Sequence, residues 1–389
     1  MTPTQSVEVR GPDASNIRLH STSTSSSSRA LRHHSIMRIN SNIRCTLFFF
    51  LSLLATTGLA EPMKIVRLSE TMIIAQAGPD ESAGRVFALN SDRGIVVIDT
   101  SSSPQTMQEA KDLIEAEFKR RDYAFVINSH DHVEHIGGNA LFPAQIIIGQ
   151  EGMVDGIAHF NATKSELIVP MKQSLAKEEA ILAATEKDTE AFRTSAEKIA
   201  KFHATLETWD SGLVCPTILF HDRLTLNLGN RTIQLISCGR GHSYSDCLIY
   251  LPEEKVLLTG GVCSKRQFPP GFPGYTGTMD VEKWISALSE FADSNHELKY
   301  IIPGHRPYLA QEDLKFIRDY YRTLWLGFNQ AKKDGLTLEQ TKQRYSLRIG
   351  FEDFPSLANP ADTTIQQHDK NMEALWAFLN RPAESRHAE

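Results

Sequence analysis

The feature that most constrains this chain is a run of three histidines and two acidic residues, His130 to His135, within the sequence NSHDHVEHIGGN. The run directly follows AFVINS, an apolar segment typical of a buried strand. Residues two apart on an extended segment point to the same side, so His130 and His132 should project together from the strand end. Two imidazoles on one rigid edge supply half of a tetrahedral zinc site, and the spacing therefore predicts a metal centre.

The residues after this pair can supply further ligands. Glu134 and His135 come just before Gly137 and Gly138, where the backbone can turn sharply. They could therefore form a second cluster that faces the first. A lone histidine is usually an ordinary surface or core residue, but three histidines at this spacing after a buried strand favour metal binding.

Two more histidines follow strand-like segments in the same way. His242 lies in ISCGRGHSYSD after the segment 232–238, and His305 lies in YIIPGHRP after 299–302. Each one alone is more typical of a glycine-flanked turn. Together, three strand-end loops that carry histidine match the way in which open α/β folds build a site at one edge.

Helical segments accompany the strands. Residues 164–208 are rich in Ala, Glu and Lys with apolar residues at helical spacing, which predicts two or three amphipathic helices. This insertion could cover the edge of the site, or it could simply pack on an outer layer. The segment 266–277, rich in Pro, Gly and aromatic residues, could line a pocket. Residues 311–389 are predicted to be a helical extension, with helices at 311–333, 337–346 and 364–380.

The N-terminal region is typical of a targeting signal. Residues 1–36 are polar and Ser-rich, so we expect a disordered or non-native extension. Residues 37–60 combine a basic start, a short apolar run and small residues before Glu61, as a secretory signal peptide does. We therefore expect translation from Met37, cleavage near Ala60 and a periplasmic or secreted mature protein. A membrane anchor or a buried helix is the alternative, but the run is short for a membrane span.

Composition narrows the classes of partner. The 389 residues, 41% of them hydrophobic, suffice for one large α/β domain or for two domains. A net charge of −6 gives no reason to expect nucleic acid or an anionic membrane surface as a partner. Because the apolar run before Glu61 is short, we expect no stable membrane anchor, and we expect a small-molecule substrate. The oligomeric state stays open.

Four cysteines follow the expected cleavage site: Cys215, Cys238, Cys247 and Cys263. Export permits disulfides, but the sequence does not decide among the possible pairings. No C-x-x-C pair occurs, so neither a thioredoxin-like motif nor a zinc ribbon is expected.

The order of these motifs resembles the metallo-β-lactamase superfamily over about residues 64–310. The family signature H-x-H-x-D-H is similar to His130-Asp131-His132-Val133-Glu134-His135, with Glu in the place of Asp. The family's later loops are similar to GRGHSYSD and IIPGHRP, and its upstream strand-end aspartate is similar to Asp99 in GIVVIDT. The resemblance implies an α/β fold, a four-layer αββα sandwich with the metals at one edge between the sheets.

The resemblance also implies roles for single residues. His130, His132 and His242 would hold one metal, and Glu134, His135 and His305 would hold a second. Asp99 would fix the histidine loop by hydrogen bonds; an ordinary turn aspartate is the alternative.

Two departures from the family pattern leave alternatives open. Glu134 is one methylene longer than Asp, so it could ligate a second metal or be a solvated acid beside a single metal. Gly261 in LLTGGVCSK stands where many members have a bridging Asp, and it cannot ligate. Cys263 comes one residue later than the cysteine of some lactamases, so it could be a zinc ligand or a buried or disulfide-bonded residue.

By resemblance, the chain would be an exported zinc-dependent hydrolase with one or two Zn²⁺, in which metal-bound hydroxide attacks a lactam, lactone, ester or thioester bond. Asp99, Glu134 and Tyr244 are the candidate catalytic residues; Tyr244 could stabilise an oxyanion or could merely pack. Two alternatives remain. One is a mononuclear iron enzyme that oxidises thiols, and the other is a zinc-binding protein without catalysis.

Overall fold

The computed structural model describes residues 5–8, 63–77, 85–263, 279–293, 296–305, 307–347, 349, 351 and 362–381. The predicted signal peptide, 37–60, and the predicted pocket-lining loop, 266–277, lie outside these residues. In the described part of the chain, no helix combines the length and the apolar character needed to cross a bilayer.

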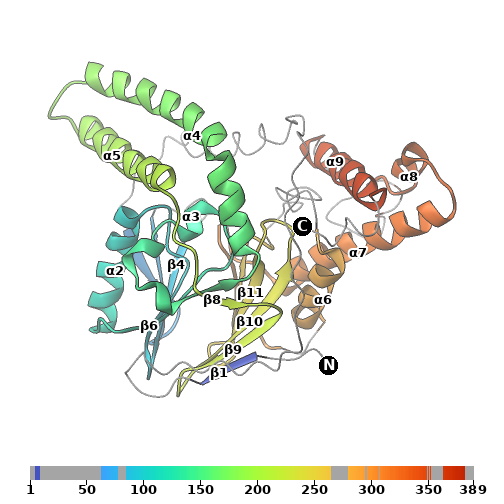
Figure 1. The fold of residues 1–389 in the computed structure, drawn as a ribbon, viewed down its shortest axis with the longest axis horizontal. Coiled ribbons are helices and arrows are strands. Elements are labelled where there is room, and N and C mark those ends of the chain that lie inside the picture. The colour runs from blue at the N-terminus through green and yellow to red at the C-terminus, as the bar shows by residue number, and fades with distance from the viewer. Residues whose placement is uncertain are drawn as a thin grey trace, which may run out of the picture.

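Two β-sheets stack face to face at the centre of the molecule (Figure 1). Among the described residues, sheet I has the order β2-β3-β4-β5-β6-β7-β8 and sheet II the order β1-β9-β10-β11-β12-β13. The strands of sheet I are β2 (Met63–Arg67), β3 (Met72–Ala77), β4 (Arg85–Ser91), β5 (Gly94–Ile98), β6 (Tyr123–Ile127), β7 (Ile147–Gln150) and β8 (Ile218–Phe220). The strands of sheet II are β1 (Gln5–Glu8), β9 (Arg223–Asn227), β10 (Thr232–Gly239), β11 (Asp246–Leu251), β12 (Val256–Gly260) and β13 (Tyr300–Pro303).

Strand direction brings the histidine loops to one edge. In sheet I, β5, β6 and β7 run parallel, so the loops after β5 and β6 leave at the same end. In sheet II, β11 is antiparallel to β10 and to β12, and β13 is parallel to β12. The ends of β10, β12 and β13 therefore also lie on one side of their sheet.

Strand β5 shows why the sheets must be covered on both faces. All five of its residues are buried. Val96 and Ile98 join the apolar cluster between the two sheets, whereas Ile95 and Val97 pack with Met107 of helix α2 (Pro104–Phe118). A strand with two apolar faces requires a layer on each side.

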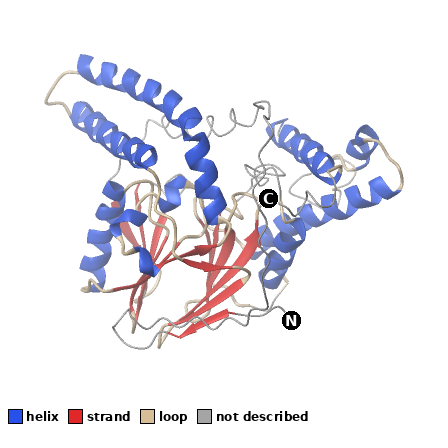
Figure 2. Cartoon of the chain, in the orientation of Figure 1, coloured by secondary structure: helices blue, strands red, loops and turns tan. Residues whose placement is uncertain are grey.

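Helices supply the two outer layers (Figure 2). Helix α2 packs on sheet I, and α6, α7 and α9 share an apolar cluster with residues of sheet II, including Ile236 and Leu248. The predicted four-layer αββα sandwich is confirmed. The helices are α2 (Pro104–Phe118), α3 (Val133–Ile136), α4 (Met153–Ala184), α5 (Glu190–Ser211), α6 (Val281–Ala292), α7 (Gln311–Lys333), α8 (Leu338–Arg344) and α9 (Asp362–Leu379), with 3-10 turns at Asn139–Leu141 and Ala144–Ile146.

Local sequence explains where several helices begin and end. Ser103 accepts a hydrogen bond from the Thr106 N–H and Pro104 occupies the first turn of α2, both of which favour a helix start. Helix α7 ends just before Gly335, whose φ of 71° lies in the left-handed region. A capping box at Thr337 then begins α8.

The helical insertion begins earlier than predicted. The composition of the segment indicated 164–208, but α4 already starts at Met153, and α4 and α5 form a hairpin that projects from the sandwich (Figure 1). Met153 and Ile157 are buried against Ile136, so tertiary packing stabilises helical turns that the sequence pattern does not mark. Pro170 lies inside α4 without ending it.

The N-terminal extension contributes one element to the described structure. Four of its residues form β1, which pairs in parallel with β9 at the edge of sheet II. This differs from the expectation of no regular structure in 1–36. An edge strand offers unpaired N–H and C=O groups, which any short extended segment can satisfy.

A buried polar network holds the C-terminal helices together. The Tyr320 hydroxyl lies 3.0 Å from His368 Nδ1 and accepts a hydrogen bond from Asn371 Nδ2. His368 Nε2 lies 2.8 Å from the Tyr345 carbonyl oxygen, so this nitrogen carries the proton and donates. Burial, the largest cause, lowers the pKa of His368 below its usual 6.5, although the bond to Tyr345 opposes the shift.

This network predicts a pH-dependent stability. His368 is neutral in the folded chain, whereas the unfolded chain binds its proton below about pH 6.5. The free energy of unfolding should therefore fall as the pH drops below 6.5. In His368→Gln this part of the dependence should disappear. Thermal unfolding of both proteins between pH 8 and pH 5 measures the difference; identical pH slopes would contradict the prediction.

Candidate metal centre

Asp99 organises the loop that carries the first histidines. It follows β5 with a φ of 62°, a left-handed conformation that Asp tolerates better than most residues. Its side chain is 1% exposed. Asp99 Oδ1 accepts from the Ser129 N–H at 2.8 Å, and Oδ2 lies 2.8 Å from Ser129 Oγ and 2.9 Å from His135 Nδ1. The carboxylate thus contacts both Ser129 and His135 of the loop after β6, and its orienting role stays a prediction.

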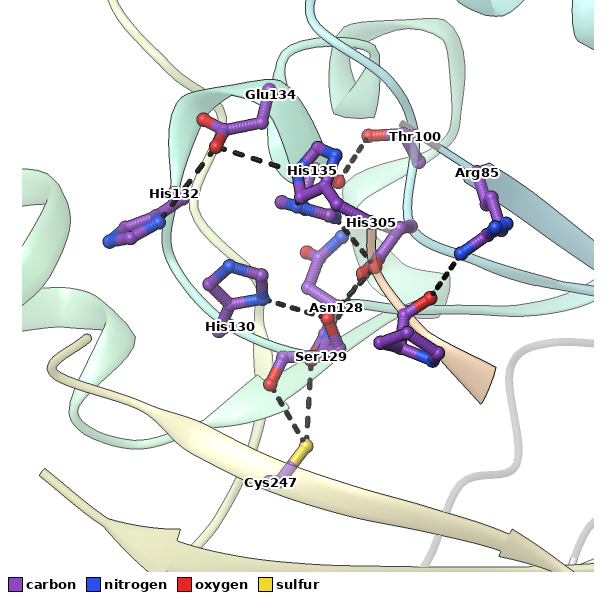
Figure 3. Close-up of polar contacts among 12 residues, drawn as sticks. Arg85, Thr100, Asn128, Ser129, His130, His132, Glu134, His135, Cys247 and His305 are labelled. Atoms are coloured by element: carbon purple, nitrogen blue, oxygen red, sulfur yellow. Dashed lines mark hydrogen bonds and ion pairs between the residues drawn. The ribbon is translucent and has the colours of Figure 1, made fainter. Parts of the chain in front are cut away.

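These hydrogen bonds fix which nitrogen of each ring is free to ligate. Ser129 Oγ donates to Asp99, so it accepts from His130 Nδ1, 2.9 Å away (Figure 3). His130 Nε2 then carries a lone pair; it is buried and has no hydrogen-bond partner among the residues that the structure describes. His135 likewise donates Nδ1–H to Asp99, and its Nε2 faces His305 Nε2 at 3.0 Å. A metal-ligating histidine is normally held in this way by a partner on its other nitrogen.

The possible ligands converge in groups of three. His130, His132 and His242 form one group, and Glu134, His135 and His305 form another. Within each group the ligand atoms lie within 4.8 Å of one another. In the second group His135 Nε2 and His305 Nε2 are 3.0 Å apart, and Glu134 Oε1 lies 3.7 Å from His305 Nε2. The structure thus brings together all six histidine and glutamate ligands expected from the sequence.

A third group contains Asp99, His130 and His135. Its carboxylate already accepts hydrogen bonds from Ser129 and His135, so this group supports the other two.

The electrostatics of the groups suit a cation. Burial, and then repulsion from His135, His132 and His242, lowers the pKa of His130 well below its usual value, so its ring is neutral. Burial alone would raise the pKa of Glu134, but the hydrogen bond to His305 and the charges of the nearby histidines outweigh it and lower the pKa. Neutral imidazoles and an ionised carboxylate are the forms that bind a metal. The donor set therefore fits Zn²⁺.

The two glycines after the histidines permit a close approach between loops. A Cβ on Gly137 would lie 2.2 Å from the Ser102 carbonyl oxygen, and one on Gly138 would lie 2.2 Å from the Thr100 carbonyl oxygen. The Thr100 N–H also donates to the His135 carbonyl oxygen at 2.7 Å. The loop after β5 and the loop after β6 thus pack directly on each other.

The His242 loop is closed by a buried carboxylate. Asp246 accepts from the Ser243 N–H at 2.9 Å and from Ser243 Oγ at 2.8 Å. Burial raises the pKa of Asp246 to about 7, although the bonds from Ser243 oppose the shift. Asp246 was not predicted as a site residue, but its place four positions after His242 in GHSYSD is a usable signal for a loop-closing acid.

Tyr244 is held by packing contacts. Its ring lies between Arg240, whose guanidinium carbon is 5.1 Å from the ring centroid, and His159 of α4, at 5.5 Å between centroids. The choice between oxyanion stabilisation and packing for Tyr244 stays a prediction.

Neither Cys263 nor Gly261 belongs to one of the three ligand groups. Cys263 is fully buried in the apolar cluster beneath α6 and α7, outside all three groups, and burial raises the pKa of its thiol far above its usual value. A Cβ on Gly261 would lie 2.0 Å from His242 Cδ2, so a side chain there would displace His242. Among the described residues, the four cysteines after Glu61 are free thiols, and no disulfide joins any two of them.

Cys263→Ala should leave the metal content of the purified protein unchanged and lower its melting temperature, because a small apolar side chain leaves the core. Elemental analysis and thermal unfolding measure the two effects. A loss of bound metal would show that Cys263 ligates after all.

Asp99→Asn should weaken metal binding roughly 10- to 100-fold, because the amide places a donor where Ser129 and His135 both donate. The exposed helical substitution Asp112→Asn is the matched control. Competition with a chromophoric chelator measures both affinities, and equal affinities would refute the orienting role of Asp99.

Comparisons with known proteins agree with this geometry. Residues 80–305 match the family model of the metallo-beta-lactamase superfamily. The chain is 28% identical over 103 residues to a metallo-beta-lactamase type 2 of Bacteroides fragilis, and this match spans 26% of the chain and 41% of the relative. It is 20% identical over 223 residues to a metallo-beta-lactamase type 2 of Bacillus cereus, which spans 56% of the chain and 65% of the relative.

A solved structure shows the same fold. A double mutant of the sec-alkyl sulfatase PisA1, from Pseudomonas sp., superposes with a TM-score of 0.52 at 16% identity, covering 82% of this chain and 50% of that one. The fold, the converging ligand groups and the match over more than half of the sequence all point to one family. The chain belongs to the metallo-beta-lactamase superfamily.

Proposed function

We propose that this protein is a zinc-dependent hydrolase with two metal positions. The first ion would be held by His130, His132 and His242, and the second by Glu134, His135 and His305. The observation that carries the proposal is the lone pair of His130 Nε2, which is buried and has no hydrogen-bond partner in the described part of the protein. The hydrogen bonds that run from His130 through Ser129 to Asp99 fix this nitrogen as the unprotonated one.

The donor chemistry supports zinc. Three imidazoles form the first group, as in zinc hydrolytic sites that leave a position open for water. The second group combines two imidazoles with a carboxylate, a set that zinc accepts. The same set also occurs at mononuclear iron sites, which is why the identity of the metal must be measured.

When bound, such ions would supply an activated water and polarise the bond to be broken. The chain's own residues prepare the site for this. Asp99 and Ser129 hold the imidazoles of His135 and His130 in a fixed orientation. Burial raises the pKa of the thiols of Cys238, Cys247 and Cys263, so none of them is a ready nucleophile. Attack by water is therefore the chemistry that this site supports best.

The substrate would be a small molecule with a lactam, lactone, ester or thioester bond. The projecting hairpin starts beside the site, where Asp155 of α4 pairs with Arg240 at 2.7 Å and Gly152 lies against the Tyr244 carbonyl oxygen. We propose that α4 and α5 border the substrate position. We also propose export, on the basis of the signal-like segment 37–60.

Metal analysis combined with hydrolysis tests this function. The chain from Glu61, purified without added metal, should contain close to two zinc ions, and a panel of lactams, lactones, esters and thioesters should show turnover of at least one class. Dialysis against a chelator should abolish turnover, and added Zn²⁺ should restore it.

The other outcomes separate the alternatives. About one iron per chain with thiol oxidation would favour the mononuclear redox enzyme. Bound zinc without turnover of any class would favour a binding protein. As a control for the ligand assignment, His305→Ala should lose one ion, whereas His159→Ala, an exposed histidine beside the site, should retain both.

A further inference from the structure

Each ligand group is completed by a histidine from the opposite sheet. His130, His132, Glu134 and His135 all follow β6 of sheet I, whereas His242 follows β10 and His305 follows β13 of sheet II. A metal site tolerates only small errors in the position of its ligands. Something must therefore hold the two sheets in register at this edge.

The first contact that does so joins the His130 loop to the His242 loop. Ser245 Oγ donates to Asp131 Oδ1 at 2.6 Å, and both residues are buried. Asp131 lies between the two histidines of its loop, and Ser245 lies three positions after His242. The hydrogen bond thus spans the two sheets within the first ligand group.

Helix α4 seals this contact. Gly156 packs so closely on Asp131 that a Cβ would lie 2.2 Å from its Oδ2. The carboxylate is 8% exposed as a result. A charge-assisted hydrogen bond in such a site is short and strong, because water competes little for it.

The second contact joins sheet I to the His305 loop. Arg85, the first residue of β4, is 1% exposed and donates from Nη1 to the Pro303 carbonyl oxygen at 2.9 Å (Figure 3). The next N–H, that of Gly304, donates to the Gly260 carbonyl oxygen at 2.9 Å. The peptide group that leads into His305 is therefore fixed on both sides.

We propose that these contacts are two separate positioning devices, one for each metal. The Asp131–Ser245 bond places His242 and so sets the affinity of the first ligand group. Arg85 places His305 and so sets the affinity of the second. This inference rests on the proposed two-metal function.

Metal titration of the full chain tests the inference. Single-ion backgrounds separate the groups: His305→Ala leaves only the first group complete, and His242→Ala leaves only the second. In the His305→Ala background, Ser245→Ala should weaken Zn²⁺ binding roughly 10- to 100-fold and Arg85→Met should change it little. In the His242→Ala background, Arg85→Met should weaken Zn²⁺ binding by the same factor, and Ser245→Ala should change it little. Competition with a chromophoric chelator gives the affinities, and the absorption spectrum of bound Co²⁺ reports the ligand geometry.

Matched controls exclude a general loss of stability. Ser289→Ala removes a hydroxyl bonded within α6, and Arg318→Met removes a buried arginine paired with Asp293 and Asp319. Both should leave the metal affinities unchanged even if they lower the melting temperature. Ser245→Thr retains the hydroxyl and should restore the first affinity. If Arg85→Met does not fold, Arg85→Lys is measured instead; it keeps the charge but loses the fixed fork of donors, and it should still weaken only the second group.

The results decide between two failures. If the affinity for both ions falls equally in every variant, or if neither affinity falls, the positioning roles are wrong. A wild-type chain that binds a single ion contradicts the proposed two-metal site instead. The inference is then tested on the affinity for that single ion. Either Ser245→Ala or Arg85→Met must lower this affinity while the other leaves it unchanged, and any other pattern refutes the positioning roles.

Discussion

The ligand geometry depends on one buried carboxylate that accepts three hydrogen bonds. Asp99 receives the N–H and the hydroxyl of Ser129 and the Nδ1–H of His135. A buried anion without partners would be costly, and these donors offset that cost. Since each donor belongs to the loop after β6, the same bonds that stabilise the charge also fix the direction of the rings.

The crowding of the histidines shows why this support is needed. The rings of His130 and His135 lie 4.2 Å apart, centre to centre, and those of His132 and His242 lie 4.4 Å apart. If protonated, such rings would repel one another at short range in a poorly solvated place. Burial, the largest cause, lowers the pKa of His130 and His242 and keeps these rings neutral. Burial would also lower the pKa of His135, but the charge of Asp99 and its hydrogen bond outweigh it and raise this pKa. Ser129 and Asp99 accept hydrogen bonds from His130 and His135, which hold the crowded rings in place.

Local patterns predicted much of this arrangement. The alternation in HDH, the glycines after His135 and the strand-end places of His242 and His305 all depend on residues near in sequence. The four-layer fold was implied by the family resemblance, and strands such as β5, which are buried on both faces, explain why it needs an outer layer on each side. The start of α4 at Met153 escaped prediction because it depends on packing against Ile136.

The long-range contacts could not be read from sequence patterns. Arg85 and Pro303 are 218 positions apart, and Asp131 and Ser245 are 114 apart. Nothing near these residues marks them as partners. Cys263 illustrates the opposite problem, because its neighbourhood suggests a ligand while its side chain belongs to the core beneath α6 and α7. Along a strand, moving a residue by one position turns its side chain to the opposite face of the sheet.

The division of each ligand group between the sheets has a consequence for the whole fold. A bound ion would cross-link the two sheets at the open edge of the sandwich, because the sheets could not separate there without releasing it. Ligand binding to the folded state alone adds to its stability by mass action. The metal-bound protein would thus resist proteolysis and thermal unfolding at this edge, where two stacked sheets otherwise separate most easily.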